Sequence, residues 1–212
     1  MADPRRTRLP RLRRAAVAAV VLAALAGGLS ACSSDDVQAS DFHGNVVPPP
    51  PFKVDGTMLE DTDGTPFSLT GSTDKRLTLV FFGYTNCPDI CPAVMANLAS
   101  AMTRLDEADR DQVEVVFVTT DPERDTPEVL RSYLDRYDKS FVGVTGSLPD
   151  IAKVGLSIGV GLGTKLPSGG YEVDAHTTQT TAIDADDEAP MFWGQQTSSA
   201  DFASDIHLLL NG

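Results

Sequence analysis

Residues 77–92 join a strongly apolar run to a pair of cysteines. They read Leu77-Thr78-Leu79-Val80-Phe81-Phe82-Gly83-Tyr84-Thr85-Asn86-Cys87-Pro88-Asp89-Ile90-Cys91-Pro92. The run over 77–82 has the length of one strand and is typical of a strand buried on both faces of a sheet. We therefore expect it to be a central strand of an α/β domain. Cys87 and Cys91 follow where this strand ends, at the rim where α/β proteins place their functional sites.

Helical and strand patterns alternate on both sides of this run. The predicted elements are an entry hairpin over 58–69, strands over 77–82, 113–118 and 141–145, helices over 87–109, 126–137, 149–156 and 199–210, and a threonine-rich hairpin strand over 171–183. Strand, helix, strand, helix and strand in this order give right-handed crossovers between parallel strands. The fold class predicted from the pattern is therefore α/β.

Composition limits what such a domain does. The chain has 212 residues, of which 42% are hydrophobic and 22% charged, enough for one globular domain with a core. Its net charge of −13 repels nucleic acid phosphates and excludes nucleic acid as a partner. Three cysteines are too few for a scaffold built from disulfides, so their role is local and chemical.

The N-terminal residues 1–31 have the pattern of an export signal. Six arginines precede an apolar run over 15–26, which is shorter than the ~20 residues that span a bilayer. The run closes on Leu29-Ser30-Ala31-Cys32, which resembles the bacterial lipoprotein box. That resemblance implies that Cys32 is acylated and becomes the mature N-terminus. The alternative is ordinary export with Cys32 incidental, and Arg5-Arg6 weakly suggests a twin-arginine signal.

Residues 32–53 are polar and then rich in proline, with four consecutive prolines at 48–51. This composition favours an extended chain and does not form a core. We expect residues 32–53 to be a lipidated tether that holds the domain, residues 54–212, up to ~60 Å from the membrane at ~3.1 Å per residue.

The spacing of Cys87 and Cys91 is open to three interpretations. At a helix N-terminus, unpaired amides and the helix dipole favour thiolate over thiol, so both cysteines are expected to be reactive. With three residues between them, the sulfurs either close a disulfide or bind one ion together. A plain structural disulfide is disfavoured because so short a loop removes little chain entropy. A thiol-disulfide enzyme normally has two residues between its cysteines, which mildly favours a metal.

Three histidines could supply an imidazole to the two cysteines. His43 lies in the predicted tether, and His207 is expected to be a partly exposed residue of the last helix. His176 lies on or beside the threonine-rich strand. A lone histidine is more often structural than a ligand, so the residues alone do not assign it.

Several segments resemble the successive motifs of one known family, the Sco/SenC proteins. The segments are Phe82-Gly83-Tyr84-Thr85, Cys87-Pro88-Asp89-Ile90-Cys91-Pro92, Val118-Thr119-Thr120-Asp121-Pro122-Glu123-Arg124-Asp125-Thr126-Pro127 and Thr145-Gly146. The resemblance spans residues 54–183. It implies a thioredoxin-like fold with a central mixed sheet, flanking helices and an N-terminal hairpin. It also implies copper binding, membrane anchoring and a role in cytochrome c oxidase assembly.

The resemblance also implies site residues. By position, Cys87 and Cys91 match the two cysteine ligands of copper and His176 matches the histidine ligand. Thiolates favour Cu(I) and imidazole accepts Cu(I) or Cu(II), so such a set can hold both. Asp121 is expected either as an outer acid of the site or as a cap of the following helix. The chain departs from the family pattern over 180–188, which bears on the partner surface more than on the ligands.

The expected function is that of a copper metallochaperone, lipid-anchored at the extracytoplasmic face of the cell membrane. Its expected partners are the cytochrome c oxidase subunit that carries the copper centre and other copper chaperones. The first alternative is a thiol-disulfide oxidoreductase that uses Cys87 and Cys91 without stable metal. The second, a peroxide-detoxifying thiol enzyme, is disfavoured because no isolated cysteine with a nearby arginine motif is present.

Overall fold

A central mixed sheet organises the computed structural model, which describes residues 37–163 and 178–212. Within these residues the sheet has eight strands. In spatial order they are β1 (Asn45–Val46), β10 (Met191–Trp193), β8 (Thr180–Asp184), β5 (Leu77–Gly83), β6 (Val113–Thr119), β7 (Val142–Thr145), β3 (Leu59–Asp61) and β4 (Pro66–Phe67). A separate pair joins β2 (Phe52–Lys53) to β9 (Glu188–Ala189).

The predicted central strand lies in the middle of this sheet. β5 pairs in parallel with β6, and β6 pairs in parallel with β7. On its other side β5 pairs with β8 in the antiparallel sense, so the sheet is mixed. All seven residues of β5 are buried, as expected for a strand covered on both faces. The entry hairpin is also confirmed, as the antiparallel pair β3 and β4.

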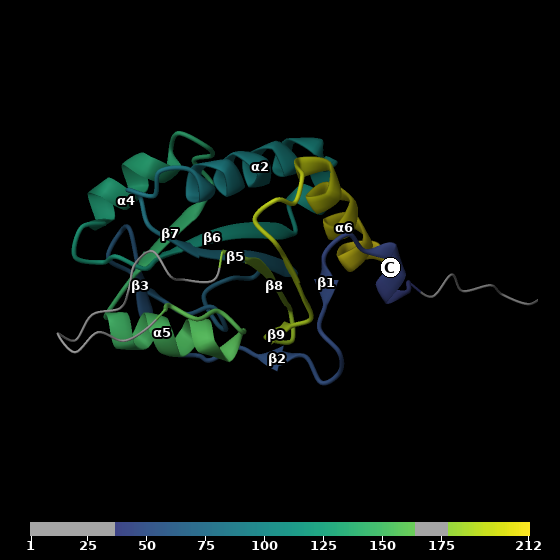
Figure 1. Ribbon diagram of the computed structural model, residues 1–212, viewed down its shortest axis with the longest axis horizontal. Helices are drawn as coiled ribbons and strands as arrows, with labels where there is room; N and C mark the ends of the chain where they lie inside the picture. The colour runs from purple at the N-terminus through teal and green to yellow at the C-terminus, as the bar shows by residue number, and fades with distance from the viewer. Residues whose placement is uncertain (1–36, 164–177) are drawn as a thin grey trace, which may run out of the picture. The chain divides into compact units, whose positions relative to one another are not determined.

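Helices cover both faces of the sheet (Figure 1). They are α2 (Ile90–Arg104), α4 (Pro127–Leu134) and α6 (Ser199–Asn211) on one face, and α5 (Leu148–Ser157) on the other. β5 divides its side chains between two cores, because successive residues of a strand point to opposite faces. Leu79 and Phe81 pack with α2, α4 and α6, whereas Val80 and Phe82 pack with α5. The predicted α/β class with flanking helices is confirmed.

The helix predicted over 87–109 is wrong in its extent. α2 begins three residues later, at Ile90, and ends at Arg104, and a short helix, α3 (Glu107–Arg110), follows. Leu105 is extended, and the side chain of Asp106 accepts the N–H of Asp109 to cap α3. The apolar spacing continues through this region, but the Asp106 cap starts a new helix.

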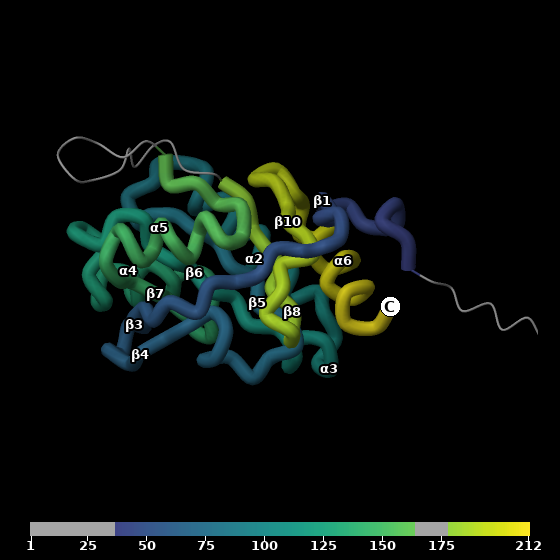
Figure 2. Tube along the Cα trace, turned by 90° about the horizontal axis from the view of Figure 1, so that it is seen from below, coloured from purple at the N-terminus to yellow at the C-terminus, as the bar shows by residue number. Residues whose placement is uncertain are grey.

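The segment expected as a free tether is folded against the domain from Val37 onward. A 3-10 helix, η1 (Ala39–Asp41), precedes β1, and β1 pairs with β10 (Figure 2). β2 then pairs with β9, and Val37–Gly212 form one unit. Backbone pairing with β10 and β9 and the packing of Phe42 against the core dock the segment in spite of its prolines. The expected boundary at residue 54 is corrected to Val37 for the described part of the chain.

One buried carboxylate fastens this segment. Asp205 of α6 is fully buried and accepts the N–H of His43 at 3.0 Å and that of Gly44 at 2.8 Å. The same carboxylate accepts Trp193 Nε1–H at 2.7 Å and contacts His43 Nδ1 at 2.9 Å. His43 therefore belongs to the folded domain and not to a tether.

Two further expectations concern residues that the structure describes only in part or not at all. Of the threonine-rich strand predicted over 171–183, the part from Thr180 forms β8, and residues 171–177 lie outside the described residues. The leader and Cys32 also lie outside them. No helix in residues 37–163 and 178–212 is long and apolar enough to cross a membrane.

Candidate functional site

The two cysteines lie at the end of β5 that leads into α2. β5 ends at Gly83, and a short loop carries Cys87 to the start of the helix at Ile90. A Cβ atom on Gly83 would lie 2.9 Å from Cys91 Sγ and 2.8 Å from the Phe81 ring. Only glycine therefore lets the strand end pass this close to the Cys91 sulfur, which explains the residue at this position.

Cys87 and Cys91 are both free thiols, and they are unequally placed. Cys91 lies in the first turn of α2 and has 0% exposure, whereas Cys87 lies before the helix and is partly exposed. The N–H of Cys91 donates to Cys87 Sγ at 3.3 Å, and the N–H of Cys87 donates to the Tyr84 carbonyl at 3.2 Å. First-turn amides lack partners inside their helix, and here one of them is taken up by a sulfur.

Burial sets the protonation of Cys91. It raises the pKa of the Cys91 thiol well above its ordinary value, and the contact with Cys87 raises it further. For Cys91, burial therefore favours the neutral thiol and opposes the effect expected from the helix N-terminus. A metal ion or a disulfide bond would have to displace this proton.

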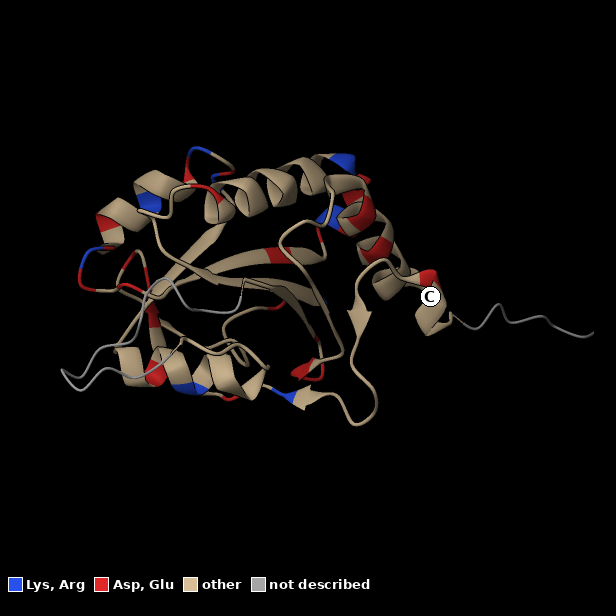
Figure 3. Cartoon of the chain, viewed as in Figure 1, with Lys and Arg blue, Asp and Glu red and all other residues tan. Residues whose placement is uncertain are grey.

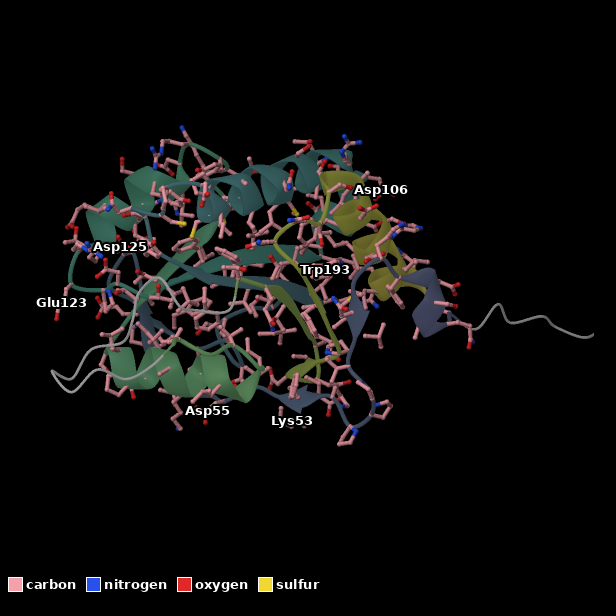
Figure 4. The ribbon with its side chains drawn as sticks, in the orientation of Figure 1. Lys53, Asp55, Asp106, Glu123, Asp125 and Trp193 are labelled. Carbon is pink, nitrogen blue, oxygen red and sulfur yellow. The ribbon has the colours of Figure 1, made fainter. Side chains whose placement is uncertain are left out.

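A third buried group, Asp125, holds the loop that precedes Cys87. The Asp125 carboxylate has 0% exposure and accepts the Thr85 N–H at 3.0 Å. It also accepts the Thr85 hydroxyl at 2.5 Å and the Thr119 hydroxyl at 2.6 Å. Figure 4 labels Asp125 beside the start of α4. Sequence reasoning did not single it out, although it lies within the motif over 118–127.

Tyr133 contributes an aromatic wall to the same core. It packs in one cluster with Cys91, and its ring lies 5.5 Å from that of Phe117. Its hydroxyl is buried and has no hydrogen-bond partner among the described residues. Burial raises the pKa of the Tyr133 hydroxyl.

Asp121 lies where β6 leaves the sheet. Its carboxylate pairs with Arg124, and its N–H donates to the Thr119 hydroxyl at 3.0 Å. Its carbonyl accepts the N–H groups of Arg124 and Asp125, so Asp121 shapes the approach to α4. Figure 3 shows that this approach carries charges of both signs. The role of Asp121 as an outer acid of the site stays a prediction.

The predicted ligands are brought together only in part. Cys87 and Cys91 are adjacent, and His176 lies outside the described residues. In the part of the chain that the structure describes, no group of three His, Cys, Asp or Glu side chains is arranged to hold a metal. His43 contacts Asp205, and His207 Nδ1 lies 2.6 Å from Asp109 Oδ2. These two histidines are therefore held by carboxylates.

Comparisons with known proteins show which family this chain resembles. A family model described as SCO1/SenC matches residues 57–211. Protein SCO2, mitochondrial, of Saccharomyces cerevisiae is 31% identical over 161 residues, which make up 72% of this chain and 51% of that protein. The chain spans between 31% and 51% of the length of eight curated relatives that it matches.

Solved structures show the same likeness. The solution structures of apo Sco1 from Thermus thermophilus have a TM-score of 0.68 and 30% identity, covering 79% of this chain and 96% of that one. The crystal structure of yeast Sco1 with copper bound has a TM-score of 0.67 and 26% identity, covering 76% and 90%. These neighbours confirm the thioredoxin-like fold that the motifs implied.

Proposed function

The chain belongs to the SCO1/SenC family, and from this premise we propose that it binds copper and serves the assembly of the copper centre of cytochrome c oxidase. One observation carries the proposal. The free thiols of Cys87 and Cys91 lie next to each other after the end of β5, where the Cys91 N–H donates to Cys87 Sγ. Related proteins support it, because yeast Sco1 has been solved with copper bound.

The two sulfurs fit copper by their chemistry. Thiolates are soft ligands that select Cu(I), and two of them from one loop and one helical turn can bind a single ion. Copper binding would release the proton of the buried Cys91 thiol, so affinity should rise with pH. We propose His176 as the third ligand, which would let the site hold Cu(II) as well.

We also propose that the protein is anchored in the membrane by lipid. The small-residue pattern before Cys32 and the arginine-rich, apolar leader over 1–31 support this placement. An acyl chain on Cys32 and export of the chain would put the domain on the extracytoplasmic face of the cell membrane. The oxidase subunit that carries the copper centre is the proposed client, and other copper chaperones are proposed as donors.

The unequal burial of the two thiols favours a second candidate function, the reduction of a disulfide in a client protein. A partly exposed Cys87 thiolate would attack the client disulfide and form a mixed disulfide, releasing one client thiolate. Cys91 would then pass its proton to the first client thiolate and attack Cys87 Sγ, which releases the second client thiolate to take up a proton from water. The chain would end as the Cys87–Cys91 disulfide and the client as a dithiol, so electrons balance without a metal.

Oxidase activity in cells that carry single variants distinguishes the two functions. Thiol exchange needs only the two cysteines, whereas copper delivery as proposed also needs His176. Cells with His176→Ala should lose oxidase activity nearly as fully as cells with Cys87→Ser, and added copper should partly restore it. A His207→Ala strain serves as the matched control and should keep activity. Full activity in His176→Ala beside inactive cysteine variants would instead support the reductase function.

A further inference from the structure

Asp125 ties together the three segments that surround the cysteine loop. It lies between β6 and α4, it accepts two hydrogen bonds from Thr85 in the loop after β5, and it accepts one from Thr119 at the end of β6. Thr120 adds a neighbouring contact, because its N–H donates to the Gly83 carbonyl at 2.7 Å. The loop after β5 is therefore held in place at Thr85, two residues before Cys87.

The carboxylate is fixed in turn by its surroundings. With no exposure to water, Asp125 depends on the hydrogen bonds it accepts, and a buried charge that loses such a bond is strongly destabilised. Hydrogen bonds to an ionised acceptor are also stronger than those between neutral groups. Any shift of Thr85 would break two of them at once, so the position of the loop is coupled to the burial of Asp125.

We propose that Asp125 is the positioning residue of the cysteine site. By holding both the N–H and the hydroxyl of Thr85, it keeps Cys87 Sγ within hydrogen-bond reach of the Cys91 N–H and keeps Cys91 covered. The purpose of this geometry, copper binding, rests on the proposed function. The geometry itself is testable without copper.

The test is competitive labelling of the reduced, metal-free full-length chain with iodoacetamide, read by mass spectrometry as the ratio of Cys87 to Cys91 modification. In the wild type Cys87 reacts first, because Cys91 is fully buried. Thr85→Val removes one hydroxyl bond to Asp125 and should lower the ratio about tenfold, the size expected for one hydrogen bond to a carboxylate. Thr85→Ser keeps the hydroxyl and should return the ratio to the wild-type value. Asp125→Asn should lower the ratio further.

Two controls separate positioning from general stability. Asp138 binds the N–H and hydroxyl of Ser140 at 2.9 and 2.8 Å in an exposed turn, as Asp125 binds Thr85, so Asp138→Asn should leave the ratio unchanged. Leu210→Ala weakens the core at the end of α6, so it reports how far destabilisation alone exposes Cys91. A ratio in Thr85→Val equal to that of Leu210→Ala at matched stability would overturn the proposal.

The outcomes also separate this proposal from the proposed function. If Asp125→Asn fails to fold, as circular dichroism would show, Thr85→Val and Thr85→Ser decide the result. A lower labelling ratio in Thr85→Val, together with a wild-type protein that binds no copper, would support positioning and refute the copper function. An unchanged ratio in Thr85→Val, in a wild-type protein that binds copper, would refute positioning and leave the copper function standing.

Discussion

The N–H of Cys91 points at Cys87 Sγ from 3.3 Å, so the first turn of α2 holds the sulfur of the residue four positions before it. This contact joins a partly exposed sulfur to a fully buried one. The two cysteines differ in solvent access and in their place in the core. Each is therefore expected to respond differently to the same substitution.

Serine at the two positions tests this difference. Cys91→Ser places a hydroxyl in an apolar core and should lower the free energy of unfolding by about 1–3 kcal/mol. Cys87→Ser changes a partly exposed loop residue and should stay within about 0.5 kcal/mol of the wild type. Urea denaturation of the reduced proteins measures both values. Equal losses at the two positions would contradict the difference in burial.

Gly83 tests the close approach of β5 to the Cys91 sulfur. Gly83→Ala brings a methyl group within 2.9 Å of Cys91 Sγ and should cost about 1–3 kcal/mol of stability through overpacking. Gly194→Ala is the matched control, because a Cβ there meets no atom within 4 Å. Thermal denaturation compares the two variants. Equal melting temperatures of Gly83→Ala and Gly194→Ala would contradict the close approach of β5 to the Cys91 sulfur.

His43 makes the docking of the N-terminal segment sensitive to pH. Its hydrogen bond to Asp205 raises the pKa of His43 above its ordinary value of 6.5, and the charges of Asp205 and Asp201 add to the effect. A raised histidine pKa means that the stabilisation is present in full below pH 6.5 and is lost as the pH rises through the folded value. Hydrogen exchange of the His43 and Gly44 amides, corrected for the intrinsic rate, should therefore show that the N-terminal segment opens more often as the pH rises above 6.5.

His43→Ala provides the matching control for that prediction. The variant keeps the backbone N–H groups that bind Asp205 and loses the titrating ring. Its corrected opening should no longer change as the pH rises above 6.5, where the raised-pKa ring of the wild type loses its proton. A pH dependence that persists in His43→Ala would assign the effect to another group.

Lipid attachment at Cys32 is tested by fractionation. Cys32→Ser removes the sulfur that carries the acyl chain. Without this lipid, the protein should move from the membrane fraction to the soluble fraction. Mass spectrometry of the wild-type N-terminal peptide should show the acyl mass on Cys32. A variant that still sediments with membranes would show that another anchor holds the chain.

Some of this structure follows directly from sequence. The run over 77–82 carries apolar side chains on both faces, so its burial and its parallel neighbours could be predicted. Cys87 and Cys91 could be placed at the end of that strand because a helix follows within a few residues. The docking of residues 37–53 could not be predicted, because it depends on strand-edge pairing and on Asp205, some 160 positions away.

Asp125 was missed for a related physical reason. A carboxylate in a charged motif normally faces water, and nothing in its neighbours reveals that Thr85 and Thr119 would surround it. The available signal was its position in the motif that joins β6 to α4. The burial that raises the pKa of Cys91 could not be predicted either, because the sequence shows the helix N-terminus but not the depth of the side chain.

Copper stoichiometry of the reduced full-length protein tests the central claim most directly. The wild type should bind one copper(I) per chain against a competing chelator, and Cys87→Ser and Cys91→Ser should each lose that binding. Loading with copper(II) should give a thiolate charge-transfer band that His176→Ala weakens or removes. One copper bound per chain with unchanged affinity in both serine variants would contradict the account.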